Sequence, residues 1–245
     1  MAAKRLRKLV LGLALVTLAG PAAAACVSMG TAYSPDGERV LYREQRTEQR
    51  QDGELVACEV DYLTPEGELF AEKTIRFDGP STAPAFTFVD YREEFREGAR
   101  PVEDVIELYS GVGEDLERRR RELPEGAVVD AGFDRFIREN FDRLRAGERL
   151  EFEFAVPAEQ RFVRFEIESE GETTYDGRPA LALRMRPASF LVRLLVEPIR
   201  LVYDEQRRLL EFAGISDIRD DQGDRHVARV VFEYPQAGGA AARGL

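Results

Sequence analysis

The sequence predicts a mainly β domain of the α+β class: a strongly curved antiparallel sheet, or open barrel, of about ten strands wrapped around one amphipathic helix at 132–146. Three observations predict this fold. Most of the chain alternates between apolar and polar residues, residues suited to tight turns separate the alternating segments, and one segment carries an apolar stripe at helical spacing. A flat sheet of this size would leave an apolar face in water, so we expect the sheet to curve around the helix.

The predicted strands rest on alternation with a period of two residues. In 150–156, for example, leucine, phenylalanine and valine share one face while glutamates occupy the other. This pattern is typical of half-buried antiparallel strands. The strands that we expect on this basis are 38–47, 54–63, 68–78, 86–95, 102–110, 148–156, 161–170, 178–187, 198–204, 208–218 and 225–234.

The connections between these strands are short and contain turn residues, as in Asp52-Gly53 and Asp176-Gly177. Short connections favour a meander of neighbouring antiparallel strands over a parallel sheet. Residues 112–128 are ambiguous, because the polar stretch within them fits either a helix or an edge strand.

The predicted helix at 132–146 rests on five apolar residues at helical spacing: Phe133, Phe136, Ile137, Phe141 and Leu144. Asp130 stands where an N-cap belongs, and Gly147 stands where a glycine commonly ends a helix. A second, shorter helix is expected at 189–197, with Phe190 and Leu194 on its apolar side.

The first 25 residues are predicted to be a cleavable secretory signal. A basic start is followed by an apolar stretch of 11 residues, Leu9 to Ala19, and then by small residues suited to a signal peptidase. That stretch is too short to cross a bilayer, which takes roughly 20 residues. We therefore expect a periplasmic protein without a transmembrane segment after cleavage, one β-rich domain at 30–235 and a disordered tail at 236–245.

The charge of the chain argues against several partners. The net charge is −11, and loss of residues 1–25 removes four basic residues, so that the charge falls to −15. Binding to nucleic acid requires a basic surface, so no nucleic-acid partner is expected. The same charge argues against docking on anionic lipid.

The two cysteines, Cys26 and Cys58, leave three interpretations open. In an oxidising compartment they are candidates for a disulfide. Cys26 would also become the first residue after cleavage, which allows a lipid anchor there, although Ala23 stands where such signals usually have a larger apolar residue. The third interpretation is a pair of free thiols.

Residues with catalytic or metal-binding potential are few, and we predict no catalytic residue, metal or cofactor. The single histidine, His226, is interpreted as an exposed strand residue. Lys73 shares the face of Ala71 and Ile75, so alternation points it inward. A buried ammonium must be paired or become neutral. The favoured interpretation is instead that the strand lies near an edge and the amine reaches water.

Two stretches, from Val128 to Gly147 and from Glu197 to Asp220, resemble an uncharacterised family of exported proteobacterial proteins, a domain of unknown function. In outline, the arrangement of a curved sheet and helices is also similar to that of periplasmic lipoprotein carriers, whose sheet holds acyl chains. This second resemblance concerns architecture only, and fold alone does not establish function.

Three functions are compatible with the sequence. The first is a non-catalytic periplasmic protein that binds or carries an apolar ligand such as a lipid. The candidate ligand-binding residues are Phe133, Phe136, Phe141, Phe190 and Leu194, with Lys73 as an inward charge. The alternative is a structural or protein-interaction module of the cell envelope, and an unrecognised hydrolase is the third. A cavity of roughly 300 Å³ or more between the helix and the sheet would favour the first function.

Overall fold

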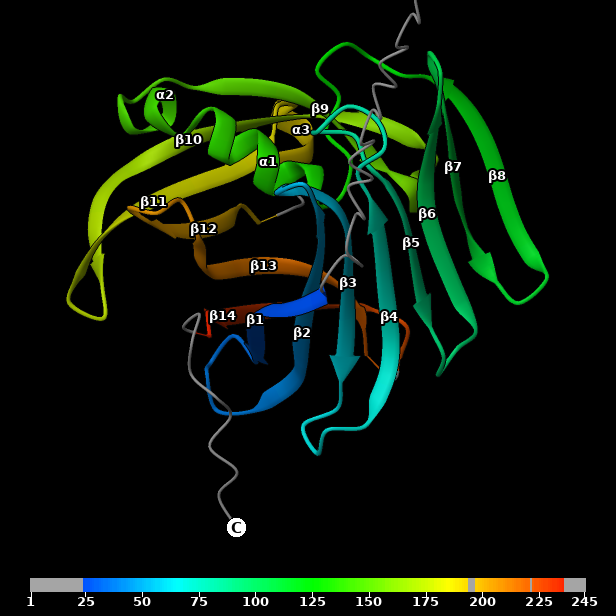
Figure 1. The fold of residues 1–245 in the computed structure, drawn as a ribbon, viewed down its shortest axis with the longest axis horizontal. Helices are drawn as coiled ribbons and strands as arrows, with labels where there is room; N and C mark the ends of the chain where they lie inside the picture. Colours follow the sequence, from blue (N-terminus) through cyan, green and yellow to red (C-terminus); the bar gives the residue numbers. More distant parts are fainter. Residues whose placement is uncertain (1–23, 194–196, 221, 236–245) are drawn as a thin grey trace, which may run out of the picture.

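The computed structural model of the chain describes residues 24–193, 197–220 and 222–235. The predicted tail at 236–245, the candidate residue Leu194 and nearly all of the predicted signal at 1–25 lie outside these residues. The described chain forms a single antiparallel sheet of fourteen strands (Figure 1). The mainly β, strongly curved architecture is confirmed, but the sheet has more strands than the ten or so expected.

The strands are β1 (Ala24–Tyr33), β2 (Val40–Gln51), β3 (Glu54–Leu63), β4 (Leu69–Arg76), β5 (Ala85–Asp90), β6 (Phe95–Val102), β7 (Val105–Val112), β8 (Asp115–Glu122), β9 (Leu150–Val156), β10 (Arg161–Tyr175), β11 (Arg178–Pro187), β12 (Ile199–Asp204), β13 (Leu209–Arg219) and β14 (Arg225–Glu233). The helical segments are α1 (Gly132–Glu139), α2 (Phe141–Arg145), α3 (Phe190–Arg193) and the short 3₁₀ turn η1 (Pro157–Glu159). None of the described helices is long and apolar enough to span a membrane.

The sheet is a meander, as predicted. Its order is β8-β7-β6-β5-β4-β3-β2-β1-β14-β13-β12-β11-β10-β9, so every neighbouring pair is consecutive in the sequence except β1 and β14. The first and last strands therefore join two meanders into one sheet. In Figure 1 the strands β2–β8 run steeply on one side, and the strands of the other half run across the picture.

The two edges of the sheet, β8 and β9, do not pair with each other. The main chain at Val128 lies along β9 instead: its N–H donates to the Glu153 carbonyl, and its carbonyl accepts from the Ala155 N–H, both at 2.9 Å. Near the same place the Arg121 Nε donates to the Gln160 carbonyl at 3.0 Å. The connection that carries α1 and α2 thus fills the gap of an open barrel.

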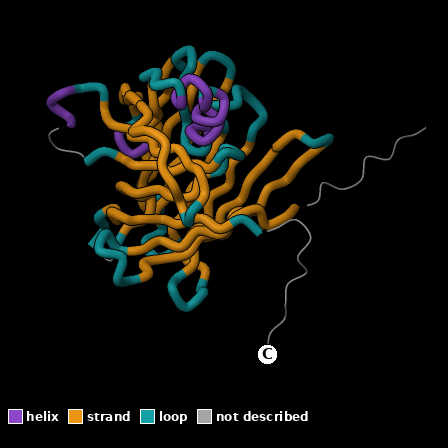
Figure 2. The backbone as a smooth tube through the Cα atoms, turned by 90° about the vertical axis from the view of Figure 1, so that its left-hand side faces the viewer, coloured by secondary structure: helices purple, strands orange, loops and turns teal. Residues whose placement is uncertain are grey.

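The single helix predicted at 132–146 is two helices, which is a correction. The break falls at Asn140, where the backbone leaves helical geometry with φ −105° and ψ 14°. The Asn140 side-chain amide donates to the Phe136 carbonyl at 2.9 Å, and the Asn140 backbone N–H donates to the same carbonyl at 3.1 Å. Figure 2 shows these helices at one end of the strands. The helix expected at 189–197 is only the single turn α3 in the described residues.

Two strands, β1 and β6, were not predicted. β1 overlaps the end of the expected signal. The ambiguous stretch at 112–128 contains the edge strand β8, one of its two interpretations, which consists almost entirely of charged residues. The predicted strands 86–95 and 102–110 are also wrong in their bounds, because β6 lies between them. Gly98, Pro101 and three charged residues hide the alternation of β6. Turns with positive φ at Glu94 and Glu103 separate it from β5 and β7.

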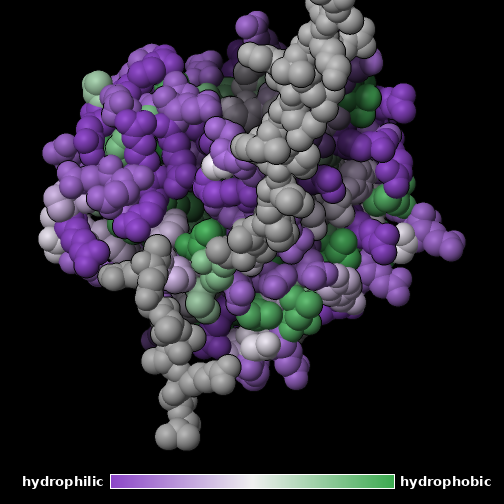
Figure 3. All heavy atoms as spheres, in the orientation of Figure 1, coloured by the Kyte–Doolittle hydropathy of each residue, from purple (hydrophilic) through white to green (hydrophobic). Residues whose placement is uncertain are grey.

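The apolar core has two parts. One cluster joins β2–β7 to residues of β13 and β14, with Phe88, Ile106 and Leu108 essentially inaccessible to solvent. The other packs α1 and α2, through Ile137 and Phe141, on β9–β12. The outer face drawn in Figure 3 is mostly hydrophilic, with hydrophobic side chains in small separate patches. The two clusters leave space between them.

Candidate functional site

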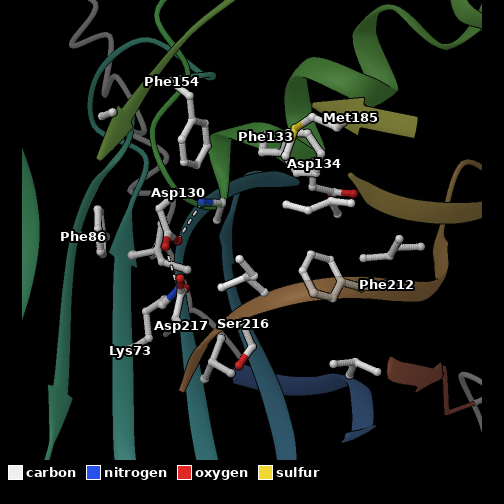
Figure 4. Close-up of a pocket in the computed structure, with 18 of the residues that line it drawn as sticks. Lys73, Phe86, Asp130, Phe133, Asp134, Phe154, Met185, Phe212, Ser216 and Asp217 are labelled. Atoms are coloured by element: carbon white, nitrogen blue, oxygen red, sulfur yellow. Dashed lines mark hydrogen bonds and ion pairs between the residues drawn. The ribbon is translucent and has the colours of Figure 1, made fainter. Parts of the chain in front are cut away.

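A cavity of about 1,030 Å³ lies inside the curved sheet. Residues of both core clusters and of α1 line it, Val230 among them. Its large apolar side chains include Phe86, Phe133, Phe154, Met185 and Phe212 (Figure 4). The other part of the wall is charged. Figure 4 shows Lys73, Asp130 and Asp217 gathered on one side, with Phe133, Met185 and Phe212 on the other.

The charged wall follows from the register of the strands. Directly paired residues on neighbouring strands point to the same face of a sheet. One such row crosses β1 to β6 and consists of Ser28, Arg46, Val60, Lys73, Phe88 and Glu97. Five of these six residues line the cavity, and Phe88 is fully buried behind it. The row therefore carries charges across the concave face, where sequence alternation predicts apolar side chains.

Lys73 is buried and paired. Its Nζ lies 2.6 Å from Asp130 Oδ1 and 2.6 Å from Asp217 Oδ2, and its residue is only 6% exposed. The favoured interpretation of an amine that reaches water is wrong, because β4 lies well inside the sheet, between β3 and β5. A buried ammonium in this position requires the two carboxylates as partners.

Asp130 is not the N-cap of α1, which is a second correction. The cap position is Ala131, and no side chain caps the helix there. Asp130 has a positive φ of 43°, and its carboxylate accepts from the Ala131 N–H at 2.6 Å as well as from Lys73. This unusual backbone conformation turns the carboxylate towards the cavity instead of over the helix end.

Arg225 extends the ion-pair network. Its guanidinium lies 3.2 Å from Glu97 Oε2 and 3.9 Å from Asp217 Oδ1. The network thus joins β4, β6, β13, β14 and Asp130, which lies two residues before α1. Periodicity in the sequence could not reveal it, since direct partners such as Lys73 and Asp217 are 144 residues apart.

The network holds Lys73 as a cation. Burial alone would lower the pKa of Lys73, but Asp130 and Asp217 outweigh burial and raise this pKa well above its ordinary value. Burial likewise favours a raised pKa for Asp217, yet Lys73 and Arg225 hold that pKa below its usual range. A permanently protonated lysine is neither a nucleophile nor a general base. Among the described residues no group of three or more His, Cys, Asp or Glu side chains is arranged to hold a metal ion.

Two carboxyl groups of the wall titrate near neutrality. Burial raises the pKa of Glu97 to about 7, against the opposing effect of Arg225. Burial also raises the pKa of Glu44 to about 7, although Lys73 and Arg46 act to lower it. Both carboxyl groups are shielded from bulk water, and the low dielectric around them disfavours their charged form.

The candidate ligand-binding residues lie in different places. Phe133 lines the cavity. Phe136 and Phe141 belong to the apolar cluster beneath the helices and do not line it. Phe190 is 71% exposed on α3. His226 is half-buried, with its ring 6.4 Å from that of Tyr42, so the interpretation as an exposed residue is also corrected.

The two cysteines are free thiols in this structure, so the candidate disulfide is not formed. Cys26 pairs with Thr47 on β2, and Thr47 pairs with Glu59 on β3. Cys26 and Glu59, the residue after Cys58, are therefore two strand spacings apart, roughly 10 Å. This distance exceeds the limit of about 7 Å for the Cα atoms of a disulfide. The two side chains also differ in face: Cys26 is exposed and Cys58 is buried.

The cavity reaches the surface. The side chains of Arg50, Glu159, Arg161 and Arg164 line it and are each at least half exposed, at 51–62%. Three of these four residues come from η1 and the start of β10. The cavity therefore opens to solvent beside η1 and the start of β10.

Comparisons with known proteins bear on the fold. No protein-family model and no curated protein matches the chain. Among solved structures, the chain is similar to a β-barrel-like protein of the domain of unknown function DUF1849 from Brucella abortus, with a TM-score of 0.50 and 7% sequence identity. The match covers 87% of this chain and 100% of that one. At 7% identity the likeness establishes the fold and no activity. The neighbour agrees with the expected uncharacterised proteobacterial domain.

Proposed function

We propose that the protein is a non-catalytic binding protein of the periplasm that holds or carries an apolar ligand, such as a lipid, in the cavity of its curved sheet. The observation that carries this proposal is the size of the cavity, about 1,030 Å³. Small-molecule sites in proteins occupy about 300–1,000 Å³ and are lined mostly by apolar side chains. A solid core would have argued against this function.

The composition of the wall supports a ligand with an apolar part and one polar end. Phenylalanines and other large apolar side chains surround one part of the space, and the buried ion pairs lie at another. Protein interiors are normally packed without such voids. The protein gives up stabilising contacts by keeping this space open, which favours a role for the space itself.

A tryptophan reporter tests the proposal directly. The chain contains no tryptophan, so Phe212→Trp places a single indole in the cavity wall. We expect a brominated ten-carbon alcohol to quench this indole with saturation. Val112→Trp is the matched control, because Val112 is 53% exposed on β7 and does not line the cavity. Equal quenching of both variants, or none in either, would overturn the proposal.

Native mass spectrometry supplies the second test. Protein purified from the periplasm is expected to carry an added mass that organic extraction removes and that a lipid accounts for. Filling the space with Ala131→Phe should reduce the fraction that carries this mass, because Ala131 lines the cavity beside Phe133. Bare wild-type protein under gentle ionisation would favour the interaction module over the carrier.

A further inference from the structure

We propose that the ligand's polar end is cationic: the cavity selects amphiphiles with an amine or ammonium head group and rejects those with an anionic one. This inference rests on the proposed function and adds the chemical class of the head group. It is carried by the placement of Glu44 and by the balance of charges around it.

The Glu44 carboxylate is the free acceptor in the wall. Glu44 lines the cavity, deep in the barrel, and forms no hydrogen bond or ion pair with any residue that the structure describes. Its side chain lies across Gly30, where an added Cβ would come within 2.5 Å of the Glu44 Cγ. Glycine at this position therefore makes room for a carboxylate inside the sheet.

The surrounding cations are already occupied. Lys73 is held by two carboxylates at 2.6 Å each, and Arg225 is held by Glu97 and Asp217. Arg46 pairs with Glu48 at 3.5 Å. Glu48 is also held by the Arg50 guanidinium at 2.8 Å. These four cations thus face four carboxylates, Glu48, Glu97, Asp130 and Asp217, before Glu44 is counted. The buried part of the wall has an excess of carboxylates, and an incoming anion would meet like charges without a free cation to receive it.

The aromatic neighbours of Glu44 fit the same ligand. Tyr62 is directly opposite Glu44 on β3, and Tyr42 precedes it on the same face of β2. Both tyrosines line the cavity, with ring centroids 6.1 Å apart. A carboxylate combined with aromatic faces is the chemistry that recognises ammonium groups, through a charge-assisted hydrogen bond and cation–π contacts.

The burial of Glu44 gives the selection its strength. Burial raises the pKa of Glu44 to about 7, so near neutral pH the Glu44 carboxyl of the empty site is partly protonated. A ligand ammonium at hydrogen-bonding distance from Glu44 stabilises the ionised carboxylate and gives it an ion-pair partner. An alkyl chain attached to that ammonium can then extend along the apolar wall formed by Phe133, Met185 and Phe212.

The test compares three probes with the same ten-carbon chain, decylammonium, decanol and decanoate, measured at pH 8 by titration calorimetry with the intact protein. We expect decylammonium to bind at least about tenfold more tightly than decanoate, with decanol between them. Glu44→Gln should lower the affinity for decylammonium about tenfold and leave decanol unchanged. Glu59→Gln, which is exposed on β3 and does not line the cavity, is the control and should change neither.

The outcomes separate the two proposals. Binding of decanol without a preference for decylammonium would overturn the cationic head group and leave the apolar cavity in place. Equal affinity of wild type and Glu44→Gln for decylammonium would do the same. Failure of all three probes to bind would overturn the proposed function together with this inference.

Discussion

Lys73 and Asp217 lie 144 residues apart in the sequence, yet the Lys73 Nζ and the Asp217 Oδ2 are 2.6 Å apart. The pair joins β4 to β13, and therefore the two meanders of the sheet, across the interior. Most ion pairs of this protein lie at the surface, where each contributes little. The Lys73 amine of this pair is buried, so a variant that removes its carboxylate partners would leave a buried charge unpaired.

Removal of the Lys73 charge should strongly destabilise the protein. Lys73→Met leaves the Asp130 carboxylate, which is 10% exposed, without its cation, whereas Asp217 is 40% exposed and keeps Arg225. We expect the free energy of unfolding to fall by about 3 kcal/mol. Urea unfolding followed by circular dichroism measures this change. The triple variant K73M/D130N/D217N removes all three charges and should recover most of the loss. Equal stability of the single and triple variants would contradict a buried, mutually dependent network.

The protonation of Lys73 has a spectroscopic signature. Lys73 is the only lysine after residue 8, so protein without residues 1–25 and labelled with ¹³Cε-lysine should give one lysine resonance. Because Asp130 and Asp217 raise the pKa of Lys73, this resonance should not titrate at the pH where free lysine does. In Asp217→Asn the midpoint should move down. An ordinary midpoint in wild type would show that the amine reaches water.

Glu44 should make the protein less stable as pH rises. Its folded-state pKa of about 7 lies above the ordinary value of 4.5, so the folded protein binds more protons than the unfolded chain between these values. The associated stability is present below pH 4.5 and is lost as pH rises through 7. Glu44→Gln should therefore gain about 1–3 kcal/mol relative to wild type between pH 5 and pH 8.

The measurement for Glu44 is the pH dependence of urea unfolding for both proteins. Glu159→Gln, with its exposed carboxylate at the cavity mouth, is the control and should follow the wild-type curve. Parallel curves for wild type and Glu44→Gln would place the Glu44 carboxyl in ordinary solvent.

The two cysteines should react at very different rates. Cys26 is exposed, whereas burial of Cys58 raises the pKa of its thiol to about 11 and blocks access. A thiol reagent at pH 8 should therefore label one cysteine quickly in the folded protein and both in urea, without reductant. Absence of any thiol in unreduced, unfolded protein would instead demonstrate a disulfide.

Gly132 should resist substitution because α1 begins against another part of the main chain. A Cβ at Gly132 would collide with the carbonyl of Thr82, which also accepts from the Val129 N–H at 2.9 Å. Gly132→Ala should cost about 1–3 kcal/mol of stability. Gly79→Ala is the control, since a Cβ there meets nothing within 4 Å and the backbone is ordinary. Equal melting temperatures for the two variants would contradict this close approach.

Much of the fold could be predicted from the sequence because alternation and turn residues are local signals. β9, β10 and β14 show apolar residues on one face and charges on the other, and their positions are close to those expected. β8 and β6 lack this contrast: one is stabilised at an edge by cross-strand charges such as Arg118 with Glu107, and the other is interrupted by glycine and proline. No local pattern distinguishes such strands from loops.

The candidate site could be predicted only in part. The inward direction of Lys73 follows from alternation, and Phe133 follows from the helical stripe. Glu44, Arg46 and Glu48 alternate with polar residues on β2, so the sequence offers no reason to place them inside. Their position depends on the register of β2 with β1 and β3, and on Gly30 opposite Glu44, and alternation within β2 does not reveal these relationships.

The pairing of β1 with β14 has a consequence for how the molecule is made. These are the first and last of the described strands, and residues such as Met29 and Glu233 pair across almost the whole of the described chain. All other neighbouring strands are consecutive in the sequence, so their contacts are local. Contacts of long sequence separation slow folding. We therefore expect the seam between β1 and β14, and with it the cavity around Lys73, to be completed after the two meanders have formed.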